Sequence, residues 1–249
     1  PRYLESGSSS DLRSIFETYR RAGIGILLDV VFNHTGEGDE NGPTICYRGL
    51  DNKSYYALSD EGSNLNYTGT GNTLNLAHPM VLRLVMDSLR YWAALGASGF
   101  RFDLATTLLR GPGEFEPGSA FLTAVSQDPI LNKLTMIAEP WDLGPNGYRL
   151  GKFPAPFSEW NDVYRDAVRR YWRGDRSQAE LARRLNGSAE LFDHAGRATT
   201  ATINFIASHD GFSLHDVVSF REKHNMANRE ENRDGHHDNC SDNLGMEGM

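Results

Sequence analysis

Short apolar runs that alternate with amphipathic helical patterns constrain this chain more than any other feature of its sequence. The apolar runs lie at residues 24–32, 99–104, 134–139 and 200–207, and we expect a further short strand at residues 157–161. Helical periodicity covers residues 11–22, 79–95, 119–127, 162–172 and 177–186. Runs of this length and type are typical of strands in a parallel sheet that is buried on both faces. Strands that alternate with helices predict an α/β fold built from parallel βα units, either an open doubly wound sheet or a barrel.

The composition excludes several classes of protein. A hydrophobic content of 39% over 249 residues is enough to build a core. The net charge is −8 and the sequence has no basic stripe, so binding to nucleic acid or to an anionic membrane surface is not favoured. No apolar run reaches the length of a membrane-spanning helix. No glycine-rich phosphate-binding motif follows any strand, so we expect no nucleotide cofactor.

The two cysteines, Cys46 and Cys240, are far apart in the sequence and do not have zinc-ligand spacing. We expect two unpaired thiols in a reducing compartment, and therefore a cytoplasmic protein. Residues 36–78 are rich in Gly, Asn, Asp, Ser and Tyr and have no clear period, which predicts a long insertion after the first run. Long insertions in compact folds are usually functional.

Polar or acidic groups follow four of the predicted strands. These groups are Asp29 to Thr35, Arg101 with Asp103, Glu139 to Trp141, and Ser208 to Asp210. In a barrel, the carboxyl ends of the strands carry the active site. The spacing between the groups corresponds to one or two βα units of roughly 30 residues each, if the insertion is set aside. We therefore expect three carboxylates, those of Asp103, Glu139 and Asp210, to share one rim.

Each group also has a purely structural interpretation. Arg101 and Asp103 leave the same face of a strand, where the guanidinium would keep the carboxylate ionised, as a nucleophile must be, but such a pair can also simply hold a barrel interior together. A lone His209–Asp210 pair or a lone Glu139 is more often structural than functional. Together, however, carboxylates in unlike surroundings are what glycoside hydrolysis requires, because one acts as nucleophile and another as proton donor.

The four groups resemble the four hallmark segments of the alpha-amylase superfamily of glycoside hydrolases, in the same order and spacing. The matching segments are Asp29-Val30-Val31-Phe32-Asn33-His34, Gly99-Phe100-Arg101-Phe102-Asp103, Ala138-Glu139-Pro140-Trp141 and Ser208-His209-Asp210. This resemblance implies a (β/α)8 TIM barrel and a retaining mechanism. It assigns Asp103 as nucleophile, Glu139 as acid/base and Asp210 as the group that orients and stabilises the distorted sugar. The residues expected to bind substrate are His34, Arg101, His209, Asn33 and Trp141.

Further segments are similar to the glycogen debranching and isoamylase branch of that family. They are Phe32 to Gly38, Arg48 to Tyr56, Gly69 to Asn75, Ser158 to Asp162 and Asn232 to Gly235. The resemblance therefore implies hydrolysis of α-1,6 branch linkages in glycogen or a limit dextrin, with a branched α-glucan as the partner, and we assign no metal ligands. A branching enzyme, or an amylase that acts on α-1,4 links, remains an alternative, as does a catalytically inactive α-glucan-binding fragment.

The resemblance also implies which part of the family's architecture the 249 residues represent. We expect a partial catalytic barrel over residues 1–249, from about the third to the seventh strand, with the insertion 36–78 after the third. The family's N-terminal β-sandwich and C-terminal β domain would lie outside these residues. A barrel without its other strands has open edges, so we expect the strands at 24–32 and 200–207 to expose apolar surface.

Overall fold

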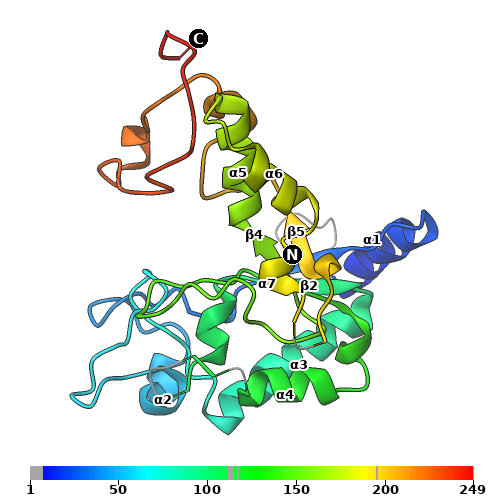
Figure 1. Ribbon diagram of the computed structural model, residues 1–249. Coiled ribbons are helices and arrows are strands. Elements are labelled where there is room, and N and C mark those ends of the chain that lie inside the picture. Colours follow the sequence, from blue (N-terminus) through cyan, green and yellow to red (C-terminus); the bar gives the residue numbers. More distant parts are fainter. Residues whose placement is uncertain (1–7, 112–114, 117, 195, 249) are drawn as a thin grey trace. The chain divides into compact units, whose positions relative to one another are not determined.

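The computed structural model describes residues 8–111, 115–116, 118–194 and 196–248. Over these residues the chain forms an α/β structure with two compact units, Pro1–Glu159 and Trp160–Met249. The first unit holds the insertion and most of the parallel sheet. The second unit holds the end of one strand, a further strand and a helical and loop-rich region (Figure 1).

The sheet of the first unit is parallel, as the sequence predicts. Its strands are β1 (Leu27–Val30), β2 (Gly99–Phe102), β3 (Thr135–Ala138) and the first half of β4 (Ser158–Asn161). β2 pairs with β1 on one side and with β3 on the other, and β3 also pairs with β4. The register sets Asp29 opposite Arg101. The carboxyl ends of β1, β2 and β3 therefore lie side by side.

The helices of the first unit are α1 (Ser9–Arg21), α2 (Arg48–Tyr55), α3 (Pro79–Leu95) and α4 (Ala120–Gln127), with short 3-10 turns at Ala105–Leu109 and Leu131–Lys133. Residues of α3 and α4 share one hydrophobic core with residues of the strands. α3 and α4 run side by side (Figure 1). α3 has the predicted bounds because His78 caps its start, proline occupies its first position, where no N–H donor is needed, and Gly96 ends it.

The alternation of side chains along β2 separates the core from the polar face. Phe100 and Phe102 are fully buried on the helical side, where the ring of Phe102 meets that of Phe121 from α4 edge to face, at a centroid distance of 5.5 Å. Arg101 points to the opposite face. Apolar residues therefore anchor β2 against α3 and α4, and this fixes the direction of the charged side chain between them.

The prediction that the first apolar run is buried on both faces is wrong. Ile24, Leu27 and Val31 are 53%, 42% and 51% exposed. Within the described residues β1 pairs only with β2, so one edge and part of one face have no covering element. Exposed apolar surface at this edge agrees with the expectation for an open sheet.

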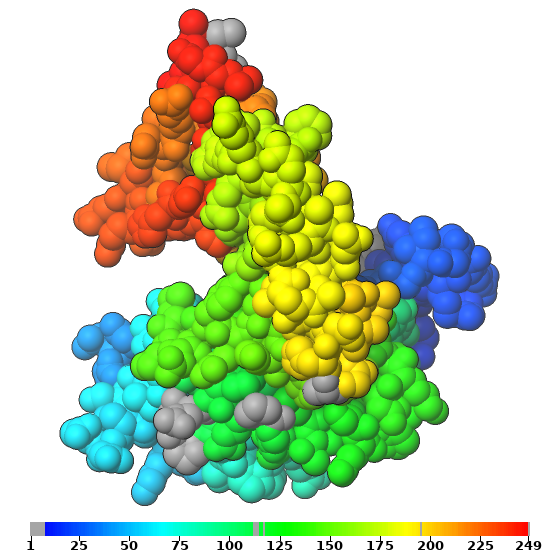
Figure 2. Space-filling view, in the orientation of Figure 1, coloured from blue at the N-terminus to red at the C-terminus, as the bar shows by residue number. Residues whose placement is uncertain are grey.

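Helix α1 is also less buried than its apolar stripe suggests. It buries Phe16 alone, whose Cβ would lie 2.9 Å from a Cβ on Gly96, so only glycine permits the approach at the end of α3. Ile15 and Tyr19 remain exposed. In the space-filling view, α1 (blue) projects from the first unit (Figure 2).

In the second unit, β4 runs directly into α5 (Asp162–Arg173), which packs beside α6 (Gln178–Leu185) (Figure 1). The remaining elements are α7 (Ala189–Phe192), β5 (Thr202–Asn204), α8 (Leu214–Val217) and 3-10 turns at Thr199–Ala201 and Met226–Asn228. Asn161 links these parts, because its amide donates to Ser188 Oγ at 3.1 Å and to Thr202 Oγ1 at 2.9 Å, while its oxygen caps α5.

Candidate active site

Arg101 is the centre of the charged cluster in the first unit. Its guanidinium contacts Asp29 Oδ1 at 2.8 Å, Asp103 Oδ1 at 3.0 Å and Glu139 Oε1 at 2.9 Å. Asp29 follows from the register of β1 and β2, whereas Asp103 and Glu139 come one residue after β2 and β3. The structure thus places Arg101, Asp103 and Glu139 together.

Arg101 stays protonated in this setting. Burial lowers the pKa of Arg101, but the charges of Glu139, Asp29 and Asp103 outweigh burial and raise it. One guanidinium faces three carboxyl groups, so negative charge exceeds positive charge in the cluster when all three are ionised. Excess negative charge can stabilise the positive charge that develops on a sugar ring during glycosidic cleavage.

Asn33 and His34 hold and flank the Asp103 carboxylate. The Asn33 amide is buried and donates to Asp103 Oδ2 at 2.8 Å and to the Asp103 carbonyl at 2.7 Å. His34 Nδ1 hydrogen-bonds with the Asn33 side-chain oxygen. Burial lowers the pKa of His34, although the charge of Asp103 opposes this, so the imidazole is neutral at neutral pH. A neutral imidazole can exchange hydrogen bonds with a sugar hydroxyl.

Glu139 is buried beside Asp103. One carboxylate oxygen of Asp103 lies within 4.8 Å of one of Glu139. Glu139 Oε2 accepts a hydrogen bond from the Leu104 N–H at 2.8 Å. Leu104 has a φ of 40°, in the left-handed region that costs a non-glycine residue about 1 kcal/mol. This strain directs an N–H at the carboxylate, and backbone strain of this kind is concentrated at functional sites.

The loop after β3 carries Trp141, which is half-buried. Its neighbour Asp142 forms a bidentate ion pair with Arg110, with both nitrogen–oxygen distances at 2.7 Å, and the Arg110 guanidinium lies over the ring of Tyr67 at 4.4 Å. Sequence reasoning missed this buried pair, since nothing in the spacing of Arg110 and Asp142 indicates contact. The pair ties the Trp141 loop to the insertion.

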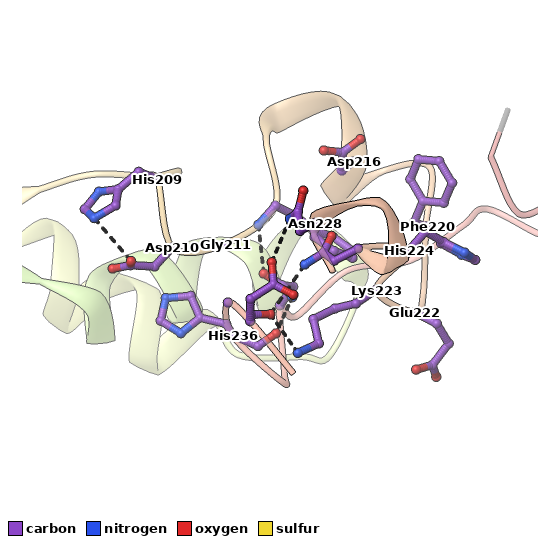
Figure 3. A pocket seen from close by; sticks show the side chains of 15 residues that line it. His209, Asp210, Gly211, Asp216, Phe220, Glu222, Lys223, His224, Asn228 and His236 are labelled. Atoms are coloured by element: carbon purple, nitrogen blue, oxygen red, sulfur yellow. Dashed lines mark hydrogen bonds and ion pairs between the residues drawn. The ribbon is translucent and has the colours of Figure 1, made fainter. Parts of the chain in front are cut away.

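The other two predicted residues, His209 and Asp210, lie in the second unit, after β5. His209 Nε2 is 3.2 Å from Asp210 Oδ1. Both line a polar pocket of about 520 Å³ (Figure 3). His236 lies beside Asp210 in this pocket, and its backbone N–H donates to the Asp210 carbonyl at 2.9 Å. The sequence indicated no functional position for His236.

Much of the pocket wall comes from residues 222–239. From Asn225 onwards the sequence is polar and has no clear period, so it predicts no regular element there. Here Asn225 N–H donates to Asn232 Oδ1 at 2.8 Å, and Asn228 donates to Asp234 Oδ2 at 2.7 Å. Lys223 Nζ donates to the Asp234 carbonyl at 2.9 Å. Side chains rather than a backbone ladder hold this loop together. The Asn232 to Gly235 segment was the only signal of it.

The insertion is organised by the buried carboxylate of Glu37. It accepts hydrogen bonds from the N–H groups of Ile45, Cys46 and Arg48, at 2.8, 2.8 and 3.0 Å, and from the Tyr56 hydroxyl. Burial raises the pKa of Glu37, but these donors outweigh burial and lower the pKa to about 2. Glu37 therefore anchors the loop that follows His34.

We expect Glu37→Gln to destabilise the folded protein by about 1.5–3 kcal/mol at neutral pH, because charge-assisted hydrogen bonds are lost. The folded pKa of about 2 lies below the ordinary 4.5. The stabilisation is therefore complete above about pH 4.5 and is lost as the pH falls towards 2. The free energies of unfolding of the wild type and Glu37→Gln, measured with denaturant, should therefore become more similar as the pH is lowered from about 6 to about 3. A constant difference over this range would contradict the assignment.

No family model matches the chain. The chain is 51% identical over 241 residues to a glycogen debranching enzyme of Erwinia tasmaniensis. The matched region covers 96% of this chain and 36% of that protein. It is 49% identical over 249 residues to a glycogen operon protein GlgX homolog of Mycobacterium bovis, which covers 98% of this chain and 34% of the relative. The chain thus spans about a third of the length of the curated relatives it matches.

Solved structures with a similar fold are pullulanases. A pullulanase of Anoxybacillus sp. LM18-11 in complex with maltotriose superposes with a TM-score of 0.67 at 22% identity, over 84% of this chain and 30% of that one. A pullulanase from Bacillus acidopullulyticus gives 0.67 at 23% identity, over 83% and 26%. The similarity confirms an α/β fold with a parallel sheet. None of the helices in the described part of the chain has the length and apolar character needed to cross a bilayer.

Proposed function

Because this chain belongs to the glycogen-debranching branch of the alpha-amylase superfamily, we propose that the whole protein hydrolyses α-1,6 branch linkages of glycogen or a limit dextrin with retention of configuration. The observation that carries this proposal is the pair of Asp103 and Glu139, whose nearest carboxylate oxygens lie within 4.8 Å of each other. Retaining glycosidases hold their two carboxyl groups about 5–5.5 Å apart, too close to admit a water between them.

In this mechanism an Asp103 oxygen attacks the anomeric carbon while the glycosidic C–O bond breaks. Glu139 gives its proton to the departing oxygen. Glu139 then takes a proton from water, whose oxygen attacks the anomeric carbon and releases the Asp103 carboxylate. Arg101 and Asn33 hold Asp103 in place throughout.

Other residues would bind the sugar ring as it flattens. Asp210 stabilises the distorted ring and its developing positive charge. The residues that contact the sugar at the point of cleavage are His34, Arg101 and His209, and Asn33 and Trp141 also take part in binding the substrate. Support comes from the position of His34 and Asn33 beside Asp103, and of His209 and Asp210 in one polar pocket.

For the fold, we propose that β1 to β5 correspond to the third to seventh strands of a (β/α)8 barrel, within a partial catalytic domain over residues 1–249. The parallel register of β1, β2 and β3 and the similarity to pullulanases support this. We also propose a cytoplasmic location, which the two free thiols, Cys46 and Cys240, support.

The linkage that the whole protein cleaves can be tested with amylopectin. Removal of branches releases reducing ends while long linear chains remain, so we expect the iodine stain to deepen. Rapid loss of colour with reducing ends would indicate an α-1,4 amylase. A change of stain without new reducing ends would indicate a branching enzyme. Binding to glycogen without either change would indicate an inactive α-glucan-binding protein.

A further inference from the structure

Arg169 lies in the middle of α5 and is only 3% exposed. Its guanidinium donates to three backbone carbonyls: Ile206 O at 2.8 Å, Asn239 O at 3.0 Å and Phe212 O at 3.2 Å. These carbonyls belong to segments that are distant from α5 in the sequence. One side chain therefore attaches two loop segments, residues 206–212 and the segment at Asn239, to α5.

The positions of these carbonyls relative to the candidate site are specific. Ile206 and Phe212 stand on either side of the short segment that carries His209 and Asp210. The third carbonyl belongs to Asn239, whose side-chain oxygen accepts a hydrogen bond from the Phe212 N–H at 2.9 Å. Arg169 thus fixes both ends of the His209–Asp210 segment, and Asn239 gives one end a second attachment.

The segment has little room to adjust without these attachments. A Cβ on Gly211 would lie 2.9 Å from both Asn239 Oδ1 and His236 Cδ2. The wall that faces the segment is therefore in close contact with its backbone. Displacement of the wall would move Asp210, because the Asp210 carbonyl accepts a hydrogen bond from the His236 N–H.

The guanidinium of Arg169 is buried at an energetic cost. Burial lowers the pKa of Arg169, and the positive charge of Arg165 lowers it further, although the negative charge of Asp166 opposes both effects. The hydrogen bonds described for its guanidinium go to neutral carbonyls, which compensate a buried charge less well than a carboxylate does. An apolar side chain of similar length would avoid this cost but would leave the three carbonyls without these donors, so the position of the loop depends on Arg169.

We propose that Arg169 is a positioning residue that holds the Asp210 carboxylate and the His209 ring in place for transition-state stabilisation. The proposal rests on the proposed function, because it assumes that this pair contacts the sugar. Only a planar fork with several donors can reach three carbonyls from different segments at once. The three donors of an ammonium group share one nitrogen, whereas the three carbonyls accept from three different nitrogens of Arg169, so lysine cannot reproduce this arrangement without displacing part of the loop.

The test is Arg169→Lys in the complete protein, assayed for release of reducing ends from amylopectin. We expect kcat to fall about 100-fold, because a displacement of about 1 Å at a catalytic group has an effect of this size. KM should change by less than about threefold, since only a transition-state interaction is lost. The matched control is Arg173→Lys, one turn further along α5, where the guanidinium pairs with Asp175. It should keep the wild-type kcat.

A second variant covers the case in which Arg169→Lys does not fold. Asn239→Ala removes the acceptor for the Phe212 N–H but leaves Arg169 in place, and should lower kcat about tenfold with KM nearly unchanged. Free guanidinium should partly restore kcat in Arg169→Ala. The proposal is overturned if kcat in both Arg169→Lys and Asn239→Ala equals that of Arg173→Lys, or if lost activity only follows lost folded protein. Absence of branch hydrolysis in the wild-type protein would instead refute the proposed function.

Discussion

Asp103→Asn in the complete protein is expected to lower kcat on a branched glucan by about 10⁴-fold or more, a loss typical for removal of a catalytic nucleophile. An amide cannot form the glycosyl ester on which the double displacement depends. Its oxygen can still accept from Arg101, which contacts Asp103 at 3.0 Å, while the hydrogen bond from the Asn33 amide to the second oxygen is lost, so the protein should fold with reduced stability. Steady-state kinetics together with a thermal melt would separate the lost chemistry from lost structure.

Asp29→Asn is the informative comparison. Asp29 also pairs with Arg101, at 2.8 Å, but its side chain is 59% exposed. We expect less than about a tenfold loss of kcat, because the pair is partly screened by solvent. Equal losses in the Asp29 and Asp103 variants would mean that the charge of the cluster matters and that Asp103 is not a nucleophile.

Glu139→Gln should lower kcat on branched glucan by about 10³-fold, within the range of general acid–base catalysis. The glutamine oxygen can still accept from the Leu104 N–H, which donates to Glu139 at 2.8 Å. The first step should therefore recover on a glycosyl fluoride, because fluoride departs without a proton. Its rate of fluoride release, compared between the variant and the wild type, measures this recovery.

The same experiment can also contradict the role of Glu139 as the acid. If Glu139→Gln is equally impaired on the fluoride and on the glucan, the side chain does not act as the acid, and its contact with Arg101 explains the loss. If the variant hydrolyses glucan at a near-normal rate, another group donates the proton. A melt that matches the wild type is required for either conclusion.

The sequence predicts the strands and the first half of the site because their physical signals are local. The alternation in β2 sends Phe100 to the core and Arg101 to the cluster, and the structure confirms that Arg101 and Asp103 pair. The bounds of α3 follow from Pro79 and Gly96, which mark a helix start and end in any context. Such signals need no knowledge of the rest of the chain.

Other features depend on contacts between distant segments. As a charged residue in an amphipathic helix, Arg169 would be expected on the exposed face of α5. Its burial follows from its hydrogen bonds to the carbonyls of Ile206, Phe212 and Asn239, which the sequence does not reveal. Helices as short as α7 and α8 have too few residues to show a period. The exposure of β1 depends on what pairs with its edge, which no local pattern reports.

The most direct test of the account is the mass of the Asp103 peptide after trapping. In Glu139→Gln, a maltosyl fluoride should glycosylate the enzyme, but no base remains to activate the water that releases it. Proteolysis and mass spectrometry should then find one maltosyl unit on the peptide that contains Asp103, and none on it in the double variant with Asp103→Asn. A maltosyl group on any other carboxylate, or fluoride release with no adduct, would contradict the assignment of Asp103 and Glu139.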